Sequence, residues 1–194
     1  FRDMKKAISR ITEALERSEK IIVFGDYDAD GVCGASLLHE FFKKIGARHE
    51  VYIPDRSKEG FGLSEKVTRD FGAGGAKLLI TVDCGVTDYN EIERANSLGV
   101  DVIILDHHLV PPRWPNAYAI IDHKHPEETY PEHVLSGAGL SFKLVQALAR
   151  SGKFEIPAGW EKWLLDLVAI AAIADMVPLT GENRVLTHYG LRVL

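Results

Sequence analysis

The chain has 194 residues, of which 46% are hydrophobic and 26% are charged, and its formal net charge is −5. These values are typical of one folded domain with its own core, and they argue against a surface that binds nucleic acid over its whole extent. The sequence has no run of about 18 apolar residues and no signal peptide, so we expect a cytoplasmic protein without a membrane span. Two cysteines, Cys33 and Cys84, are too few for a disulfide framework and are expected to be small buried residues.

Apolar strands alternate with amphipathic helices along the first 125 residues. The first helix places Ile8, Ile11 and Leu15 at helical spacing, and the fourth is expected to begin from Thr87 as its N-cap. The expected strands cover residues 20–26, 48–54, 77–85, 100–108 and 117–122, and the expected helices between them cover residues 3–17, 30–46, 63–72 and 87–99.

After residue 125 the pattern changes to helices, expected at residues 136–152, 159–175 and 182–194. We therefore predict an α/β fold, in which a Rossmann-like parallel sheet of about five strands has helices on both faces and is followed by a helical C-terminal part. Residues 1–194 are expected to form a single domain, with the sheet core in 1–125 and the helical part in 126–194. Ligands of such sheets bind beyond the carboxyl ends of the strands.

Acids and histidines follow three of the expected strands and one of the expected helices. GDYDADG follows KIIVF, DCG follows LLITV, DHH follows VIIL, and a further Asp ends the apolar helix LLDLVAIAAIAD. Each motif alone has another explanation, since DYDADG suits an Asp-rich turn and DHH suits a solvated strand end. Together the motifs contribute Asp26, Asp28, Asp30, Asp83, Asp106, His107, His108 and Asp175.

Crowded carboxylates repel one another, and burying them is costly unless cations compensate their charge. Carboxylates combined with one or two imidazoles suit Mn²⁺ or Mg²⁺ better than Zn²⁺, which favours thiolates. The joint pattern therefore predicts one or two Mn²⁺ or Mg²⁺ ions at the carboxyl edge of the sheet.

The motifs DADG, VDCG, DHH and AIADMVP, in this order, make nearly the whole chain similar to the DHH phosphoesterase superfamily. Within it, GDYDADG, YIPDRSKEGFGL and LSGAGLSFKL resemble the RecJ exonucleases rather than the oligoribonuclease and pyrophosphatase branches. The resemblance implies a metal-dependent, single-strand-specific DNA exonuclease that degrades from the five-prime end with metal-activated water, in DNA repair and recombination. Its partners would be single-stranded DNA and other repair proteins, without a membrane.

The resemblance also implies which residues bind the metal. Asp28 and Asp30 would each bind one of two ions, and Asp83 would bridge them. His107 and Asp175 would complete the second site. The expected catalytic residues are Asp83, His107 and His108.

Other residues are expected to contact the substrate or to support the metal ligands. His108 would contact a substrate phosphate, and Asp106 would orient a metal-binding histidine. The loop DRSKEGFG places Arg56 and Lys58 near the strand ends, and Arg113 follows DHH, so these cations are candidates for phosphate binding. Ordinary surface charge is the alternative explanation for all three.

Two departures from the superfamily pattern accompany the resemblance. The upstream histidine of the superfamily falls on Phe24, which cannot bind a metal, and Asp26 is a candidate to replace it. The Gly-rich motif of the DHHA1 domain that RecJ-like enzymes carry is absent. Because the chain opens with FRDMKK and closes in the middle of the pattern ENRVLTHYGLRVL, we expect a fragment. Without the DHHA1 half of the cleft, the fragment is expected to bind Mn²⁺ but to degrade DNA poorly.

Three alternatives remain for the function. A DHH phosphoesterase could act on small substrates such as oligoribonucleotides, cyclic dinucleotides or pyrophosphate. A phosphatase of the haloacid dehalogenase type would use a nucleophilic Asp after a strand, but it would leave DHH and VDCG unexplained. A catalytically inactive scaffold like Cdc45 would have lost its metals, whereas acids and histidines remain at every expected ligand position except Phe24.

Overall fold

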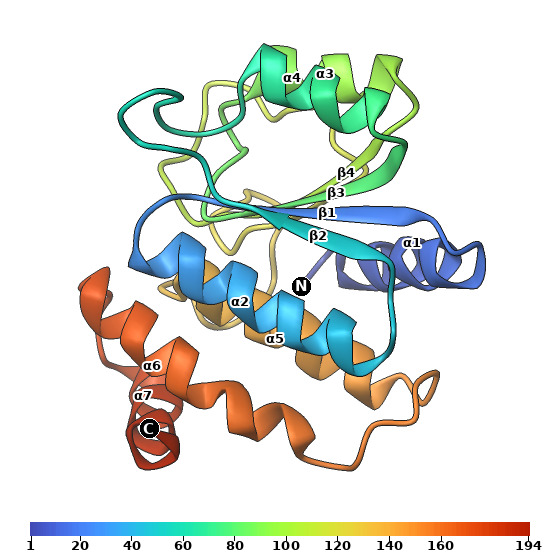
Figure 1. The fold of residues 1–194 in the computed structure, drawn as a ribbon. Helices are drawn as coiled ribbons and strands as arrows, with labels where there is room; N and C mark the ends of the chain where they lie inside the picture. Colours follow the sequence, from blue (N-terminus) through green and yellow to red (C-terminus); the bar gives the residue numbers. More distant parts are fainter.

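A computed structural model describes all 194 residues of the chain (Figure 1). Its five strands are all parallel and lie in the order β2-β1-β3-β4-β5. They are β1 (Lys20–Gly25), β2 (His49–Tyr52), β3 (Ala76–Val82), β4 (Asp101–Leu105) and β5 (Ala119–Ile121). The predicted α/β class and the predicted number of strands are therefore confirmed.

Helices cover both faces of the sheet. Figure 1 shows α3 and α4 on one face and α1, α2 and α5 on the other, with α6 and α7 packed beyond α2 and α5. The helices are α1 (Met4–Glu16), α2 (Ala29–Lys44), α3 (Glu65–Ala73), α4 (Tyr89–Ser97), α5 (Gly137–Arg150), α6 (Leu165–Ala174) and α7 (Gly181–Val193), and a 3₁₀ turn η1 (Trp160–Leu164) precedes α6. No helix combines the length and the apolar character that crossing a bilayer requires.

The sheet separates two hydrophobic clusters, which explains why its strands read as continuous apolar runs. Ile21 and Val23 of β1 belong to the larger cluster, under α2 and α5, whereas Ile22 and Phe24 belong to the cluster under α3 and α4. Successive side chains of a strand point to opposite faces, so a strand covered on both faces needs apolar residues throughout. Phe24 is fully buried and stacks on Tyr52 at 5.7 Å between ring centroids, so it lies in the core and not in a ligand position.

The strand order creates a crevice between the carboxyl ends of β1 and β3. From β1 the chain passes to β2 on one side and then returns to β3 on the other side of β1. Connections that leave in opposite directions open a crevice at this point, which is where ligands of open α/β sheets bind. Asp26 follows β1 directly and Asp83 follows β3 directly, so both acids lie at the crevice.

Two differences between the expected and the observed helices have a clear local reason. Helix α4 begins at Tyr89, and its N-cap position is held by Asp88 instead of Thr87. The reason is a turn closed by the Asp88 N–H, which donates to the Gly85 carbonyl at 3.1 Å and leaves Thr87 inside the turn. The expected helix 159–175 is divided, because Gly159 has a left-handed conformation and is the N-cap of the 3₁₀ turn that precedes α6.

Candidate metal centre

The acids of GDYDADG occupy the turn that joins β1 to α2. Asp28 is the N-cap of α2, and its Oδ1 accepts hydrogen bonds from the N–H groups of Asp30 at 2.9 Å and Gly31 at 3.0 Å. An Asp at this position satisfies N–H groups that the helix leaves unpaired. Because Asp28 and Asp30 flank the first residue of the helix, their carboxylates face different neighbours. Asp26 and Asp30 are buried, and Asp28 is exposed.

Asp83 follows β3 in a left-handed backbone conformation, with φ at +63°. Such a φ is uncommon for a residue other than glycine, and Asn and Asp tolerate it best. The N–H of Asp83 donates to the Leu105 carbonyl at 2.8 Å, which ties the residue after β3 to the end of the parallel strand β4. Strained backbone of this kind often marks a functional site.

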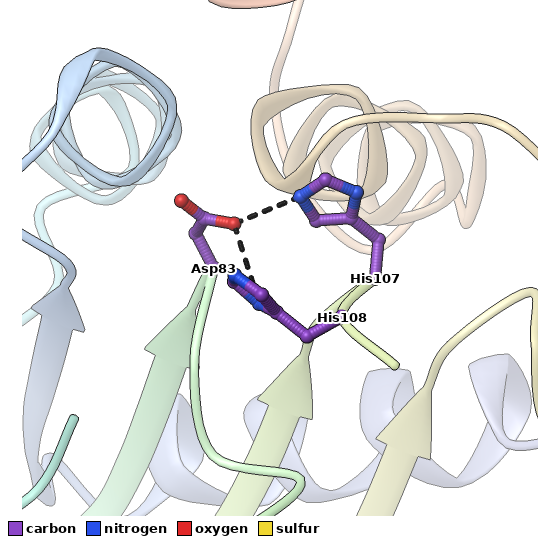
Figure 2. Close-up of side chains that lie close together, drawn as sticks. All are labelled: Asp83, His107 and His108. Atoms are coloured by element: carbon purple, nitrogen blue, oxygen red, sulfur yellow. Dashed lines mark hydrogen bonds and ion pairs between the residues drawn. The ribbon is translucent and has the colours of Figure 1, made fainter. Parts of the chain in front are cut away.

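The DHH loop after β4 carries two histidines toward Asp83. Figure 2 shows both imidazoles pointing from this loop to the carboxylate at the end of β3. Nε2 of His107 lies 2.9 Å from Oδ1 of Asp83, 3.4 Å from Oδ2 of Asp30 and 3.6 Å from Oδ2 of Asp175. One imidazole nitrogen therefore faces three carboxylates from three different segments of the chain.

Asp106, the first residue of DHH, fixes the loop through hydrogen bonds to its backbone. It is only 1% exposed, and its Oδ2 accepts the N–H of Val86 at 3.0 Å. Its Oδ1 accepts the backbone N–H groups of His107 at 2.7 Å and His108 at 3.2 Å, and lies 2.7 Å from Nδ1 of His108. The carboxylate of Asp106 therefore contacts the ring of His108, the predicted phosphate contact, and only the backbone N–H of His107, the predicted metal ligand.

Three overlapping groups of side chains could each hold a metal ion. In every group the potential ligand atoms lie within 4.8 Å of one another. Asp83 belongs to two of the groups and so does His107, which makes them the shared members of the cluster. The groups are Asp26, Asp28 and Asp83; Asp30, His107 and Asp175; and Asp83, His107 and His108.

The electrostatics of the cluster show how unfavourable it is without added positive charge. Burial, reinforced by the charge of Asp30, raises the pKa of Asp83 to about 7. Burial also raises the pKa values of Asp26 and Asp175. Burial disfavours a charged imidazole, yet the carboxylates of Asp30 and Asp83 outweigh this effect and raise the pKa of His107 to about 10. The carboxylates thus hold a proton where a cation would serve the same purpose.

The chemistry of the side chains fits a divalent ion that prefers oxygen. Oδ1 of Asp26 is buried without any hydrogen-bond partner, beside Asp28 and Asp83. A buried polar atom normally has a partner, and a divalent cation held by this acidic group would supply one to Oδ1 of Asp26. The ligand set of carboxylates with one or two imidazoles suits Mn²⁺ or Mg²⁺.

The three side chains predicted to bind phosphate differ in their neighbours. The guanidinium of Arg56 lies 5.2 Å from the ring centroid of Tyr27, which stands between the first two acids of GDYDADG. Lys58 forms an exposed ion pair with Asp55 at 2.8 Å. Arg113 lies 4.6 Å from the ring centroid of Tyr89 on α4. Only Arg56 therefore stacks on a residue of the acidic motif.

The sequence did not indicate which groups donate hydrogen bonds to the proposed metal ligands. The first turn of α5 donates two backbone N–H groups to Asp30, and Nζ of Lys124 donates to the carbonyl of His107. The motif LSGAGLSFKL contains the α5 turn, but its glycines gave no indication of which acid they would meet. Lys124 follows β5, at the same sheet edge as the other motifs, so its position after a strand was the available signal.

A protein-family comparison matches residues 20–172 to the DHH family, N-terminal domain. The single-stranded-DNA-specific exonuclease RecJ of Bacillus subtilis is 45% identical over 194 residues, which are 100% of this chain and 24% of that protein. The chain therefore spans about a quarter of the length of this relative.

Solved structures give the same similarity in three dimensions. The crystal structure of exonuclease RecJ bound to manganese has a TM-score of 0.87 and 33% sequence identity, covering 97% of this chain and 47% of that one. RecJ of Thermus thermophilus in complex with Mn²⁺ has a TM-score of 0.81 and 32% identity, covering 97% of this chain and 26% of that one.

Proposed function

The chain belongs to the DHH family, and from this premise we propose that it is the catalytic domain of a metal-dependent exonuclease specific for single-stranded DNA. The observation that carries the proposal is the convergence of Asp30, Asp83 and Asp175 on Nε2 of His107. Two relatives that are 45% and 38% identical to this chain are named single-stranded-DNA-specific exonucleases. We take residues 1–194 as one catalytic domain, with the sheet in 1–125 and helices in 126–194.

The proposed ligand sets follow two of the three groups of side chains, with Asp83 added to the second set. Asp26, Asp28 and Asp83 would hold one ion. Asp26 would thereby replace the histidine of the superfamily, whose position is occupied by Phe24 in this chain. Bound Mn²⁺ or Mg²⁺ would supply an activated water and offset negative charge at the phosphate under attack. The second ion would be held by Asp30, Asp83, His107 and Asp175.

His108 is proposed to contact the substrate. Its Nδ1 is bound to Asp106 at 2.7 Å, which leaves Nε2 as the nitrogen available to a phosphate oxygen. The hydrogen bond with Asp106 raises the pKa of His108, so the ring carries positive charge over a wider pH range. A charged imidazole stabilises a phosphate better than a neutral one. The side chain is 44% exposed, so a ligand can reach it.

We propose that two side chains of the loop after β2 contact the DNA strand. Arg56 lies on the ring of Tyr27, so its charge is beside the acidic cluster, where the phosphate under attack would lie. Phe61 is 48% exposed and meets the ring of His108 edge to face at 5.3 Å. An exposed aromatic ring next to a phosphate-binding group suits the stacking of an unpaired base.

The cellular setting follows from the proposed reaction. Degradation of single strands from the five-prime end belongs to DNA repair and recombination, and it would take place in the cytoplasm with other repair proteins as partners. A covalent intermediate is not part of the proposal. Cys84, which follows Asp83 directly, is fully buried, and burial raises the pKa of its thiol well above the usual value.

A substrate panel with Mn²⁺ tests the proposal on the full-length protein. The panel contains single-stranded DNA with a five-prime phosphate, the same strand in a duplex, short RNA, a cyclic dinucleotide and pyrophosphate. We expect mononucleotides to be released from the single-stranded DNA fastest. Faster hydrolysis of pyrophosphate, the cyclic dinucleotide or short RNA would instead support the alternative of a DHH phosphoesterase on small substrates.

The same panel distinguishes the proposal from an inactive scaffold. A Cdc45-like protein would turn over none of the substrates and would give no heat in a titration with Mn²⁺. The three groups of carboxylates and imidazoles whose ligand atoms lie within 4.8 Å of one another favour a protein that binds ions over such a scaffold.

A further inference from the structure

We propose that the first turn of α5 is a positioning element for the metal ligands Asp30 and Asp83, and that Gly137 is the residue that makes this possible. The inference rests on the proposed metal-dependent function and extends it to a segment more than 100 residues from Asp30, whose carboxylate it holds. The three residues come from α2, from the end of β3 and from α5, so the contact exists only in the folded chain.

Both carboxylate oxygens of Asp30 are held by this turn. Oδ2 accepts the N–H of Gly137 at 2.6 Å, and Oδ1 accepts the N–H of Ala138 at 2.8 Å. These N–H groups belong to the first turn of a 14-residue helix, whose N-terminus carries partial positive charge. The turn therefore both orients the carboxylate and attracts its negative charge.

The hydrogen bonds leave Asp30 able to bind an ion. Each carboxylate oxygen has two lone pairs, and the α5 turn uses one on each oxygen. Oδ2 of Asp30 also lies 3.4 Å from Nε2 of His107, so its remaining lone pair faces the cluster. Because the side chain is 1% exposed and fixed at both oxygens, it is already oriented before an ion arrives. Ligands that are ordered in advance lose less entropy on binding.

Gly137 is needed because the turn approaches Asp83 so closely. A Cβ at residue 137 would lie 2.8 Å from Cβ and 3.1 Å from Cα of Asp83, and 3.2 Å from Oδ2 of Asp30. The first of these distances is shorter than real contacts allow, and the atoms involved are close to the backbone and cannot rotate away. Any other residue would have to push apart the end of β3 and the first turn of α5.

The turn is further located by the close packing of small residues. A Cβ at Gly34 of α2 would lie 2.6 Å from Val82 and 3.1 Å from the Cα of Ala138, so α2 and α5 approach closely here. Cys33, Ala138 and Ala171 form a small buried cluster that joins α2, α5 and α6. Since α6 ends at Asp175, the same packing connects the turn with a third proposed metal ligand.

The test compares Gly137→Ala with Gly139→Ala in the full-length protein. A Cβ at Gly139 would meet Cβ of Leu135 at 3.4 Å and Oγ of Ser136 at 3.6 Å, which are ordinary contacts. Both variants add one methyl group to the same turn, but only the first one reaches the acids. Mn²⁺ affinity is measured by calorimetric titration, the melting temperature is measured in EDTA, and kcat and KM are measured on single-stranded DNA.

We expect Gly137→Ala to weaken Mn²⁺ binding by about tenfold or more, as disturbance of groups behind metal ligands usually does. The value of kcat should fall at saturating DNA, with KM changed less, and Gly139→Ala should match the wild type in Mn²⁺ affinity. A purely structural role would lower the melting temperature of Gly137→Ala in EDTA and leave the Mn²⁺ affinity of the folded protein unchanged. That result overturns the inference.

A second variant covers the case in which Gly137→Ala does not fold. Ser136 is the N-cap of α5, and its side chain accepts the N–H of Gly139 at 3.2 Å. Ser136→Ala loosens the same turn without adding an atom, so we expect weaker Mn²⁺ binding in a folded protein, and an unchanged affinity contradicts the inference. If the wild type itself binds no Mn²⁺ and degrades no DNA, the proposed function has failed. If the wild type is active and the variants bind Mn²⁺ as tightly as it does, only the positioning role has failed.

Discussion

His107 and Asp83 meet at 2.9 Å between Nε2 and Oδ1, across the gap that separates the ends of β4 and β3 (Figure 2). The two residues are 24 positions apart in the sequence, yet each belongs to two of the three groups able to bind an ion. Their contact therefore defines the centre of the site. From this contact we can predict which single substitutions should remove metal binding and which should not.

Asp83→Asn is expected to abolish Mn²⁺ binding and DNA hydrolysis. Loss of a group behind a metal ligand costs about 10- to 100-fold in affinity or activity, so loss of the shared ligand should cost more. Asn is preferable to Ala here, because Asn tolerates the left-handed backbone at φ +63°. Calorimetry with Mn²⁺ checks the first effect, and unchanged or increased stability in EDTA shows that the variant is folded. Mn²⁺ affinity equal to that of the wild type would contradict the shared-ligand role.

Asp106→Asn is expected to weaken both folding and metal binding without removing a ligand. The carboxylate accepts three backbone N–H groups and contacts Nδ1 of His108, and an amide can no longer accept at every one of these positions. An unsatisfied buried N–H costs about 1 to 3 kcal/mol, which urea unfolding in EDTA would detect.

A neighbouring acid provides the control for Asp106. Asp122 is fully buried after β5, but its carboxylate accepts only one N–H, that of Lys124 at 2.7 Å. Asp122→Asn can keep that bond, so its Mn²⁺ affinity should remain within error of the wild type. If Asp122→Asn and Asp106→Asn weaken Mn²⁺ binding equally, the specific role of Asp106 in the DHH loop is wrong.

Arg56→Ala is expected to raise KM for single-stranded DNA and to reduce the salt dependence of binding. Removing one phosphate contact lowers the slope of log affinity against log salt by about one. Lys58→Ala should change the slope less, because its charge is already paired with Asp55 at 2.8 Å. The control is Arg69→Ala, since Arg69 pairs with Glu65 on α3 at 2.7 Å. Equal salt slopes for Arg56→Ala and Arg69→Ala would remove Arg56 from the DNA contacts.

Asp88→Asn is expected to stabilise the protein at neutral pH and to do so less in acid. Burial raises the pKa of Asp88 from 3.8 to about 6, so the folded state holds this proton more tightly than the unfolded state does. The stability of the wild type therefore gains from Asp88 as pH falls from about 6 toward 4, and the charged form is a burden above that range. Asn can still accept the N–H of Leu63, which Asp88 Oδ2 accepts at 2.8 Å.

Urea unfolding of both proteins in EDTA at pH 8 and pH 4.5 measures this effect. The variant should be more stable by about 1 to 2 kcal/mol at pH 8, and the difference should shrink at pH 4.5. Subtracting the wild type at each pH removes the contributions of the other titrating groups. A difference that stays constant between the two pH values would show that the proton on Asp88 is not the cause.

The sequence by itself determined the fold class and the side chains that contribute to the site. Apolar runs such as KIIVF and LLITV indicate strands buried on both faces, and strands of this kind alternate with helices only in parallel α/β sheets. The carboxyl ends of parallel strands share one edge of the sheet. This arrangement alone requires that the same edge carries Asp26, Asp83 and His107. These inferences need only local periodicity and the handedness of the connections.

The tertiary structure decided how these side chains are grouped. Asp28 and Asp30 are two residues apart, but one caps α2 while the other is held by α5, and no sequence spacing distinguishes these directions. The strand order, which puts the crevice between β1 and β3, and the clearance between Gly137 and Asp83 depend on how the helices pack. Such contacts join residues that are far apart in the sequence. Because protein interiors are close-packed, one methyl group decides whether two segments fit together, and sequence spacing does not reveal this fit.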